Sequence, residues 1–168
     1  MTPTKPSAPT KPSAPTKPAI TDGALRLIVE SSAVLAWLLD EPRGAEVART
    51  LASAACVVTS RLTLLECERA LVRAERLGVI DASAASAARG LLATAAIHWT
   101  VIDLTESVFA RARGPFPREP VRTLDAIHLA TAQVVRSVEP IGVVRSLDER
   151  VRVNAAALGF ELLPAGAD

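Results

Sequence analysis

The feature that most constrains this chain is an alternation, from Leu25 onward, of short β-branched runs with longer alanine-rich stretches of helical periodicity. This alternation is typical of a mainly parallel sheet covered by helices on both faces. The predicted strands are 27–30, 56–59, 99–102, 142–144 and 161–163. The predicted helices are 32–39, 44–54, 62–77, 82–97, 106–113, 124–136 and 147–158. We therefore expect an α/β fold in three layers, with about five strands flanked by about seven helices.

The first 24 residues differ in composition from the rest. TKPSAP occupies residues 4–9 and again 10–15, and Thr16 begins a third, incomplete copy. Proline at this frequency is incompatible with helix, so we predict a disordered or polyproline-like tail over residues 1–24. Its lysines could contact RNA, although a solvated extension is the simpler interpretation. Residues 25–168 are then one domain, since a chain of 168 residues with 49% hydrophobic residues can bury one sizeable core but hardly two.

Charge and residue usage exclude several classes of function. The net charge is +1, but the first twenty residues hold three lysines and no acid, which leaves −2 for the rest, so the domain is not a basic nucleic-acid clamp. Two cysteines and two histidines give neither a disulfide framework nor zinc-ligand spacing. No apolar run of about 18 residues and no secretory signal pattern occurs, so we expect a cytoplasmic protein without membrane contact.

Glu30 is the first acid in an unusual place. It ends the apolar run 27–29 and so lies at the carboxyl end of a predicted strand, where functional groups gather in parallel sheets. Ser31 and Ser32 follow it and can cap the next helix. A solvated strand-end acid remains the alternative interpretation of Glu30.

Glu66 is the second such acid. It lies on the apolar side of the predicted helix 62–77, where an isolated carboxylate is unfavourable unless it is paired, protonated or metal-bound. A salt bridge with Arg69 or Arg73 remains the alternative to metal binding.

Asp125 and Asp148 occupy the first turns of two predicted helices, each two residues after a hydroxyl, Thr123 or Ser146, that can cap the helix. The helix dipole alone explains an acid at that position. However, Asp125 shares the apolar side of its helix with Leu129, and Asp148 closely follows a predicted strand. Both acids are therefore expected at the edge of the sheet.

Four carboxylates at one sheet edge would repel each other unless a cation lay among them. Mg2+ and Mn2+ are hard cations that take oxygen ligands and often retain several waters. Such an ion can activate a water for attack on a phosphodiester and can stabilise the leaving oxygen. A slightly acidic domain could bind RNA in this way, at the scissile phosphate.

Four segments of the chain resemble, in order, the signature stretches of PIN domains, and specifically those of VapC-like toxin ribonucleases of type II toxin–antitoxin systems. They are LIVESSAVLAWLLDEP, VVTSRLTLLECERAL, VRTLDAIHLATAQ and VVRSLDERVRVNAAALGFELLP. The resemblance covers nearly everything after Leu25, and RTLDAIHLATA is its most specific element. It implies a PIN-like nuclease domain over 25–168 that cuts RNA to leave 5′-phosphate and 3′-hydroxyl ends. It also implies Mg2+ or Mn2+ as cofactor, a small antitoxin as partner, and a homodimer.

The same resemblance assigns roles to the acids and to two hydroxyls. The residues are Glu30, Asp125 and Asp148 as metal ligands, Glu66 to complete the shell or orient the water, and Ser31 and Ser146 in support. Arg122 is the candidate phosphate contact, with a structural salt bridge as its alternative. For His128, one turn after Asp125, a packed helix histidine is the simpler interpretation. Asp103 ends a strand at the same edge, and capping the next helix is its simpler use.

One departure from the family pattern leaves a second function open. The first acid of the family is usually aspartate, and the extra methylene of Glu30 would place the carboxylate about 1.5 Å further out. The main alternative is therefore a degenerate PIN fold that binds RNA or protein without cutting. A nuclease that acts on DNA or in housekeeping RNA processing also remains open. A phosphatase is unsupported, because no strand end carries an Asp-x-Asp pair.

Overall fold

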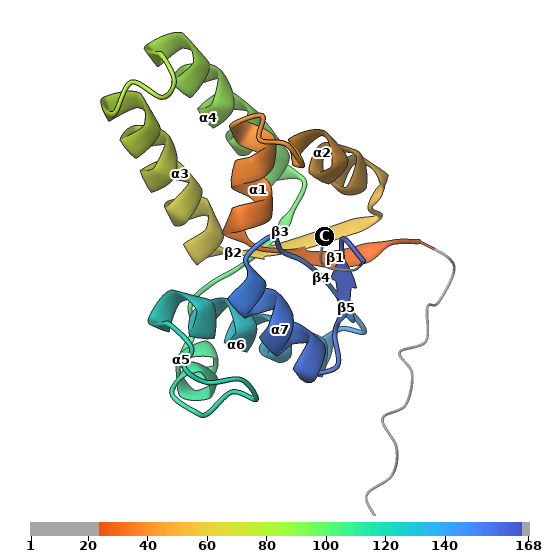
Figure 1. Cartoon of the computed structure of the whole chain (residues 1–168). Coiled ribbons are helices and arrows are strands. Elements are labelled where there is room, and N and C mark those ends of the chain that lie inside the picture. The colour runs from red at the N-terminus through yellow and green to blue at the C-terminus, as the bar shows by residue number, and fades with distance from the viewer. Residues whose placement is uncertain (1–23, 166–168) are drawn as a thin grey trace, which may run out of the picture.

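The computed structural model describes residues 24–165. One five-stranded sheet lies between two layers of helices, with strand order β3-β2-β1-β4-β5 and every neighbouring pair parallel (Figure 1). The predicted three-layer α/β fold is thus confirmed. The repeat tail predicted over 1–24 lies outside the described residues except for its last position.

The observed elements follow the predicted ones closely. The strands are β1 (Arg26–Val29), β2 (Cys56–Ser60), β3 (Thr100–Ile102), β4 (Val143–Arg145) and β5 (Glu161–Leu163). The helices are α1 (Ser31–Leu38), α2 (Gly44–Ser53), α3 (Arg61–Arg76), α4 (Ala82–Ile97), α5 (Glu106–Ala112), α6 (Thr123–Val138) and α7 (Glu149–Ala157). No boundary differs from its prediction by more than two residues.

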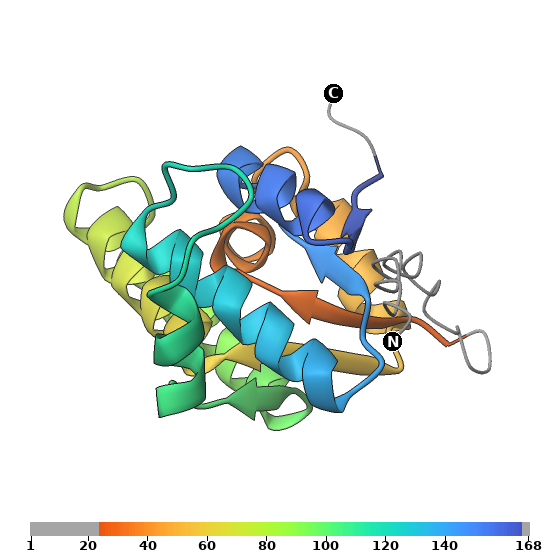
Figure 2. The same cartoon turned by 90° about the horizontal axis from the view of Figure 1, so that it is seen from below.

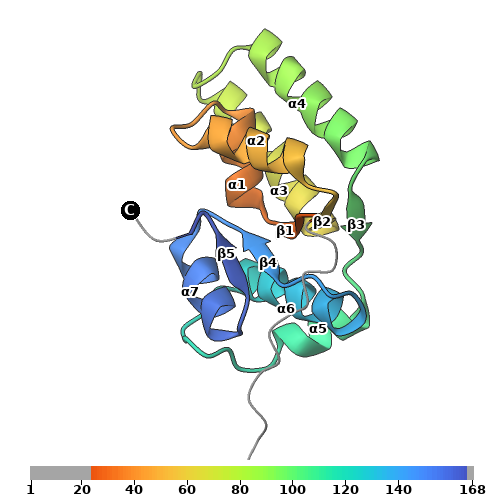
Figure 3. The same ribbon diagram turned by 90° about the vertical axis from the view of Figure 1, so that its right-hand side faces the viewer.

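Side-chain alternation along β1 divides the core into two parts. Leu27 and Val29 point to one face of the sheet and pack with Leu71 of α3, whereas Ile28 points to the other face and packs with Leu129 of α6. Helices α1 to α4 cover the first face and α5 to α7 the second (Figure 3). The view from below shows α6 running across the second face (Figure 2). Both faces of β1 are buried, which explains its continuous apolar sequence.

The order of the strands creates one distinctive place in the fold. From the central β1 the chain moves outward to β2 and β3, then crosses to β4 on the other side of β1. Val29 pairs with Arg145, so Glu30 and Ser146 follow at the same level of two neighbouring strands. In open parallel sheets, ligands bind at the carboxyl ends of strands where the strand order reverses, and that place here is the end of β1 and β4.

Helices α1 and α2 approach each other closely at Gly44. A Cβ atom added there would overlap the carbonyl oxygen of Ala36 in α1. The first residue of α2 is therefore restricted to glycine by packing. Among residues 24–165, no helix combines the length and the apolar character needed to cross a membrane.

Candidate active site

Glu30 lies where β1 passes into α1, and its side chain is almost fully buried, with 5% exposed. Its carboxylate accepts hydrogen bonds from the Ser32 backbone N–H at 3.0 Å, from the Ser31 hydroxyl at 3.3 Å and from the Ser32 hydroxyl. Glu30 is therefore the N-cap of α1. The prediction that Ser31 or Ser32 caps this helix is wrong, because the Glu30 carboxylate itself accepts from the backbone N–H of the first turn.

The Ser32 hydroxyl joins the two strand ends. Besides donating to Glu30, it accepts hydrogen bonds from the backbone N–H groups of Leu147 at 2.8 Å and Asp148 at 3.0 Å. The turn after β4 is thereby fixed to the start of α1. Sequence reasoning considered Ser32 only as a possible cap and missed this role, because its partners lie 115 and 116 residues away.

Glu66, on α3, faces the same edge and has two partners. Its Oε2 accepts from the Ser31 hydroxyl at 2.8 Å and lies 2.6 Å from Nε2 of His128 in α6. The one Ser31 hydroxyl hydrogen is shared between Glu66 at 2.8 Å and Glu30 at 3.3 Å, so Ser31 links the two acids. No described ion pair joins Glu66 to Arg69 or Arg73, so the salt bridge considered from the sequence does not form.

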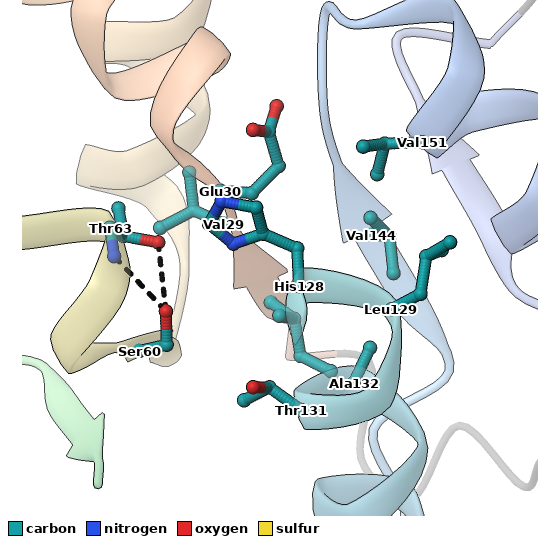
Figure 4. Close-up of a pocket in the computed structure, with 11 residues that line it drawn as sticks. Val29, Glu30, Ser60, Thr63, His128, Leu129, Thr131, Ala132, Val144 and Val151 are labelled. Carbon is teal, nitrogen blue, oxygen red and sulfur yellow. Dashed lines mark hydrogen bonds between the residues drawn. The ribbon is translucent and has the colours of Figure 1, made fainter. Parts of the chain in front are cut away.

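The Glu66–His128 contact changes the acidity of both groups. Burial raises the pKa of Glu66, but the hydrogen bond and charge of His128 outweigh this effect and hold the pKa below its usual value. Burial lowers the pKa of His128, yet the contact with Glu66 and the charge of Glu30 leave it above its usual value. His128 is packed in its helix, as interpreted, with 7% exposed, and it also holds an acid of the site. Figure 4 shows its ring projecting from α6 toward the end of β1.

Asp148 is the N-cap of α7. Its carboxylate accepts hydrogen bonds from the backbone N–H groups of Arg150 at 2.8 Å and Val151 at 3.2 Å. The Ser146 hydroxyl instead accepts from the Asp148 N–H at 3.1 Å. The prediction that Ser146 caps this helix is therefore wrong, since Ser146 positions the capping residue.

Asp125 lies in the first turn of α6, and its Oδ2 atom is buried without a hydrogen-bond partner. Burial raises the pKa of Asp125, and the charge of Asp148 raises it further. The two aspartates are thus electrostatic neighbours. Thr123 is the first residue of α6 rather than its cap, because the N-cap position belongs to Arg122, whose side chain makes no capping bond.

Two further residues complete the predicted set. Arg122 is exposed, forms no ion pair with any residue in 24–165, and its charge acts against the rise in the Asp125 pKa. The structural salt bridge considered for it therefore does not form among these residues. Asp103 is paired with Arg61 at 3.0 Å on the surface and does not cap α5. Its predicted capping role is wrong.

A small cavity lies beneath these acids, between β1 and α6 (Figure 4). It measures about 10 Å³ and is lined mainly by apolar side chains, with Glu30 and His128 among them. A cavity of this size holds about one water. A substrate must therefore approach the acids from the open edge of the sheet.

The acids come as two pairs, Glu30 with Glu66 through Ser31, and Asp125 beside Asp148. Within residues 24–165, no three His, Cys, Asp or Glu side chains lie close enough together to hold one ion as they are placed. The donor chemistry nevertheless fits a hard divalent cation, because every side chain of the two pairs offers carboxylate oxygens. The buried, unpartnered Oδ2 of Asp125 is an unfavourable state that a bound cation would relieve.

Comparison with known proteins gives consistent results. The model of the PIN domain family matches residues 27–157. Ribonuclease VapC46 of Mycobacterium tuberculosis is 34% identical over 137 residues, which cover 82% of this chain and 95% of the relative. Ribonuclease VapC35 of the same species is 29% identical over 144 residues, covering 84% of this chain and 89% of the relative.

The fold agrees with a solved structure of the same group. The crystal structure of Mycobacterium tuberculosis VapC20, described as a sarcin-ricin loop cleaving toxin, superposes with a TM-score of 0.55 at 21% identity. The match covers 80% of this chain and 95% of that structure. With the family match over residues 27–157 and the sequence identity to VapC46, the chain belongs to the PIN domain family as a VapC-like member.

Proposed function

We propose that this protein is an endoribonuclease that hydrolyses RNA phosphodiester bonds and acts as the toxin of a toxin–antitoxin pair. The observation that carries the proposal is the buried, unpartnered Oδ2 of Asp125 beside Asp148, at the point where the strand order of the sheet reverses. The carboxylates of Asp125 and Asp148 are electrostatic neighbours, and the raised pKa of Asp125 indicates negative charge that a bound cation would offset. The relatives named ribonucleases support RNA as the substrate.

The proposed cofactor is Mg2+ or Mn2+, with Asp125, Asp148 and Glu30 as ligands and Glu66 completing the shell or orienting the attacking water. When bound, such an ion lowers the pKa of a water and stabilises charge on the leaving oxygen. His128 and Ser31 would hold the carboxylate of Glu66 in one orientation.

The remaining proposed roles concern the position of Asp148 and the binding of the substrate. Ser32 and Ser146 hold the backbone N–H of Asp148, so the capping carboxylate of α7 stays at the sheet edge. Arg122, exposed at the start of α6 and free of ion pairs within 24–165, would contact a phosphate of the substrate.

A small antitoxin and a second copy of the chain are the proposed protein partners, and the cytoplasm is the proposed location. These follow from membership of the VapC-like group. Growth arrest on expression, relieved by co-expression of a short protein from a neighbouring gene, is the expected result. Arrest that no such neighbour relieves would contradict the toxin assignment and leave the nuclease intact.

Cleavage of a mixed pool of cellular RNA, with Mg2+, with Mn2+ and with EDTA, tests the central proposal. Wild type should give discrete cuts with a metal and none with EDTA. Asp125→Asn should give none under any condition. The matched control is Asp103→Asn, an acid at the same sheet edge that pairs with Arg61 instead, and it should cut like wild type. Absence of cutting by the folded wild type with either metal would overturn the proposal.

One observation favours a binding module as the second candidate. The Glu30 carboxylate already accepts three hydrogen bonds at the start of α1, and no described contact joins it directly to Asp125 or Asp148. If this engagement prevents catalysis, wild type should bind RNA without cutting, and Glu30→Asp should restore cutting. Cutting by wild type at the same rate as Glu30→Asp would exclude the degenerate module.

A further inference from the structure

A groove between α1 and α3 opens directly from the candidate site and has a volume of about 570 Å³. Its lining residues are Ser31, Leu35, Glu66, Arg69, Ala70, Val72, Arg73 and Arg76. Helices α1 and α3 lie side by side on the first face of the sheet (Figures 1 and 3). We propose that this groove binds the phosphate backbone of the RNA strand next to the cleaved bond, through arginines of α3; this inference rests on the proposed ribonuclease function.

The three arginines form a row along one side of the helix. Arg69, Arg73 and Arg76 are spaced by four and three residues, so they project from the same face and span about 10 Å along the helix axis. That length can contact more than one phosphate of a strand, whose charges repeat every few ångströms. All three side chains are exposed, and none has an ion pair with any residue in 24–165. Their guanidinium groups are thus available to a ligand.

Two of the three acids of α3 lie away from this row. Glu68 and Glu75 lie on another side of the helix, turned toward α4, and share Arg89 of α4, at 3.8 Å and 2.8 Å. The charges of Glu68 and Glu75 are therefore balanced by the neighbouring helix, and on the groove side Glu66 at the inner end is the acid among the three arginines. In a domain with a negative formal charge, this segregation gives a local positive strip, which is the arrangement that a polyanion requires.

The inner end of the groove lies at the candidate catalytic acids, where the bond to be cleaved would be placed. Glu66 lines its inner end and lies one turn before Arg69 on the same helix, so a strand bound along α3 leads to the acidic edge of the sheet. Leu35, Ala70 and Val72 add apolar surface to the same groove, against which the faces of unpaired bases can be buried. An acidic protein segment would also be attracted by the three arginines. Its binding would not, however, depend on the arginine row ending at the candidate catalytic acids. The observations therefore favour single-stranded RNA.

The test compares two charge-matched double variants of the full chain, Arg73→Gln/Arg76→Gln and Arg49→Gln/Arg113→Gln. The first removes two positive charges from the groove, and the second removes two exposed charges from α2 and the end of α5. Arg69 is left in place because it lies closest to Glu66. A short, labelled single-stranded RNA is titrated with each protein in EDTA, over a range of salt concentrations, so that binding is read without cleavage.

The groove variant should bind about tenfold more weakly than wild type near 0.15 M salt, and its slope of log affinity against log salt should be smaller by about 1.4, because each phosphate contact contributes about 0.7 for a single strand. The control variant should differ from wild type by less than twofold. With metal, the groove variant should cut with a raised KM and an unchanged kcat. Thermal unfolding separates these effects from loss of structure, since only a misfolded variant would change binding and Tm together.

Equal affinity and equal salt slopes for the groove variant and the control would overturn the inference, and a protein segment would then be the remaining occupant of the groove. This failure is distinct from that of the proposed function. If wild type never cuts RNA, the ribonuclease proposal fails, whereas the binding titration in EDTA still reports whether α3 contacts phosphates.

Discussion

Asp125→Asn should stabilise the metal-free protein while it abolishes cleavage. In the folded protein Oδ2 of Asp125 is buried without a partner, and burial together with the charge of Asp148 raises the pKa of the group. Ionisation of Asp125 therefore opposes folding at neutral pH. Asparagine has nearly the same shape, carries no charge and can donate to a neighbouring carboxylate. Since Asp125 is partly exposed and solvent screens its charge, we expect a gain of about 0.5–1 kcal/mol in unfolding free energy, or about 1–4 °C in Tm.

Thermal unfolding with EDTA and with increasing Mg2+ or Mn2+ measures this effect. Wild type should gain stability with the cation, by about 2.7 kcal/mol at a hundred times the Kd, and Asp125→Asn should gain little. Asp103→Asn is the control, because its partner Arg61 lies on the surface and its cation response should match wild type. A variant that is less stable than wild type in EDTA would refute the argument that Asp125 is held in an unfavourable state. A variant that keeps the full cation response would refute its role as a ligand.

The remaining predictions concern pH and packing. In EDTA, the higher unfolding free energy of Asp125→Asn relative to wild type should be present at neutral pH. It should disappear below about pH 4, where the wild-type carboxyl is protonated in both the folded and the unfolded state. A constant difference in unfolding free energy across this pH range would contradict an electrostatic cause. Leu71→Ala should lower the unfolding free energy in urea by about 2–5 kcal/mol, because Leu71 is fully buried. Leu65→Ala, on the same helix but exposed, should change it by less than about 0.5 kcal/mol. Gly44→Ala should lower Tm because the added Cβ would overlap the backbone of α1. Gly90→Ala, at an open helix position, should instead raise the unfolding free energy by about 0.5–1 kcal/mol. Equal changes in stability for the two variants would contradict the close packing at Gly44.

The order and type of the elements could be predicted because each has a local signal. The run 27–29 is apolar throughout, which is the pattern of a strand buried on both faces, and β1 is at the centre of the sheet. The helices are long and periodic, as in α3 and α6. These signals act within a few residues, and the structure confirms them. The position of the acids at the sheet edge follows from the same signals, since parallel strands present their carboxyl ends together.

The partners of the acids could not be predicted, because they lie far away in the sequence. Glu66 and His128 are 62 residues apart, and nothing in either segment indicates the other. A local alternative, Arg69 or Arg73, was considered for Glu66 instead. Likewise a hydroxyl before a helix suggested capping by Ser146, but the fold leaves that role to Asp148, since its carboxylate reaches two backbone N–H groups of the first turn.

Glu30 combines a local role with a distant one, because it caps α1 and contacts the Ser32 hydroxyl that also accepts from the Asp148 N–H. The Glu30 carboxylate accepts from the Ser32 N–H, which satisfies a backbone donor of the first turn. A cation that recruits Glu30 must therefore compete with the cap of α1, and an N-cap contributes about 1 kcal/mol. That amount corresponds to a loss of about fivefold in affinity for the cation. At a cation concentration a hundred times the original Kd, a fivefold rise in Kd would reduce the stabilisation by the ion from about 2.7 to about 1.8 kcal/mol. On this argument the capping role of Glu30 weakens the proposed metal site without removing it.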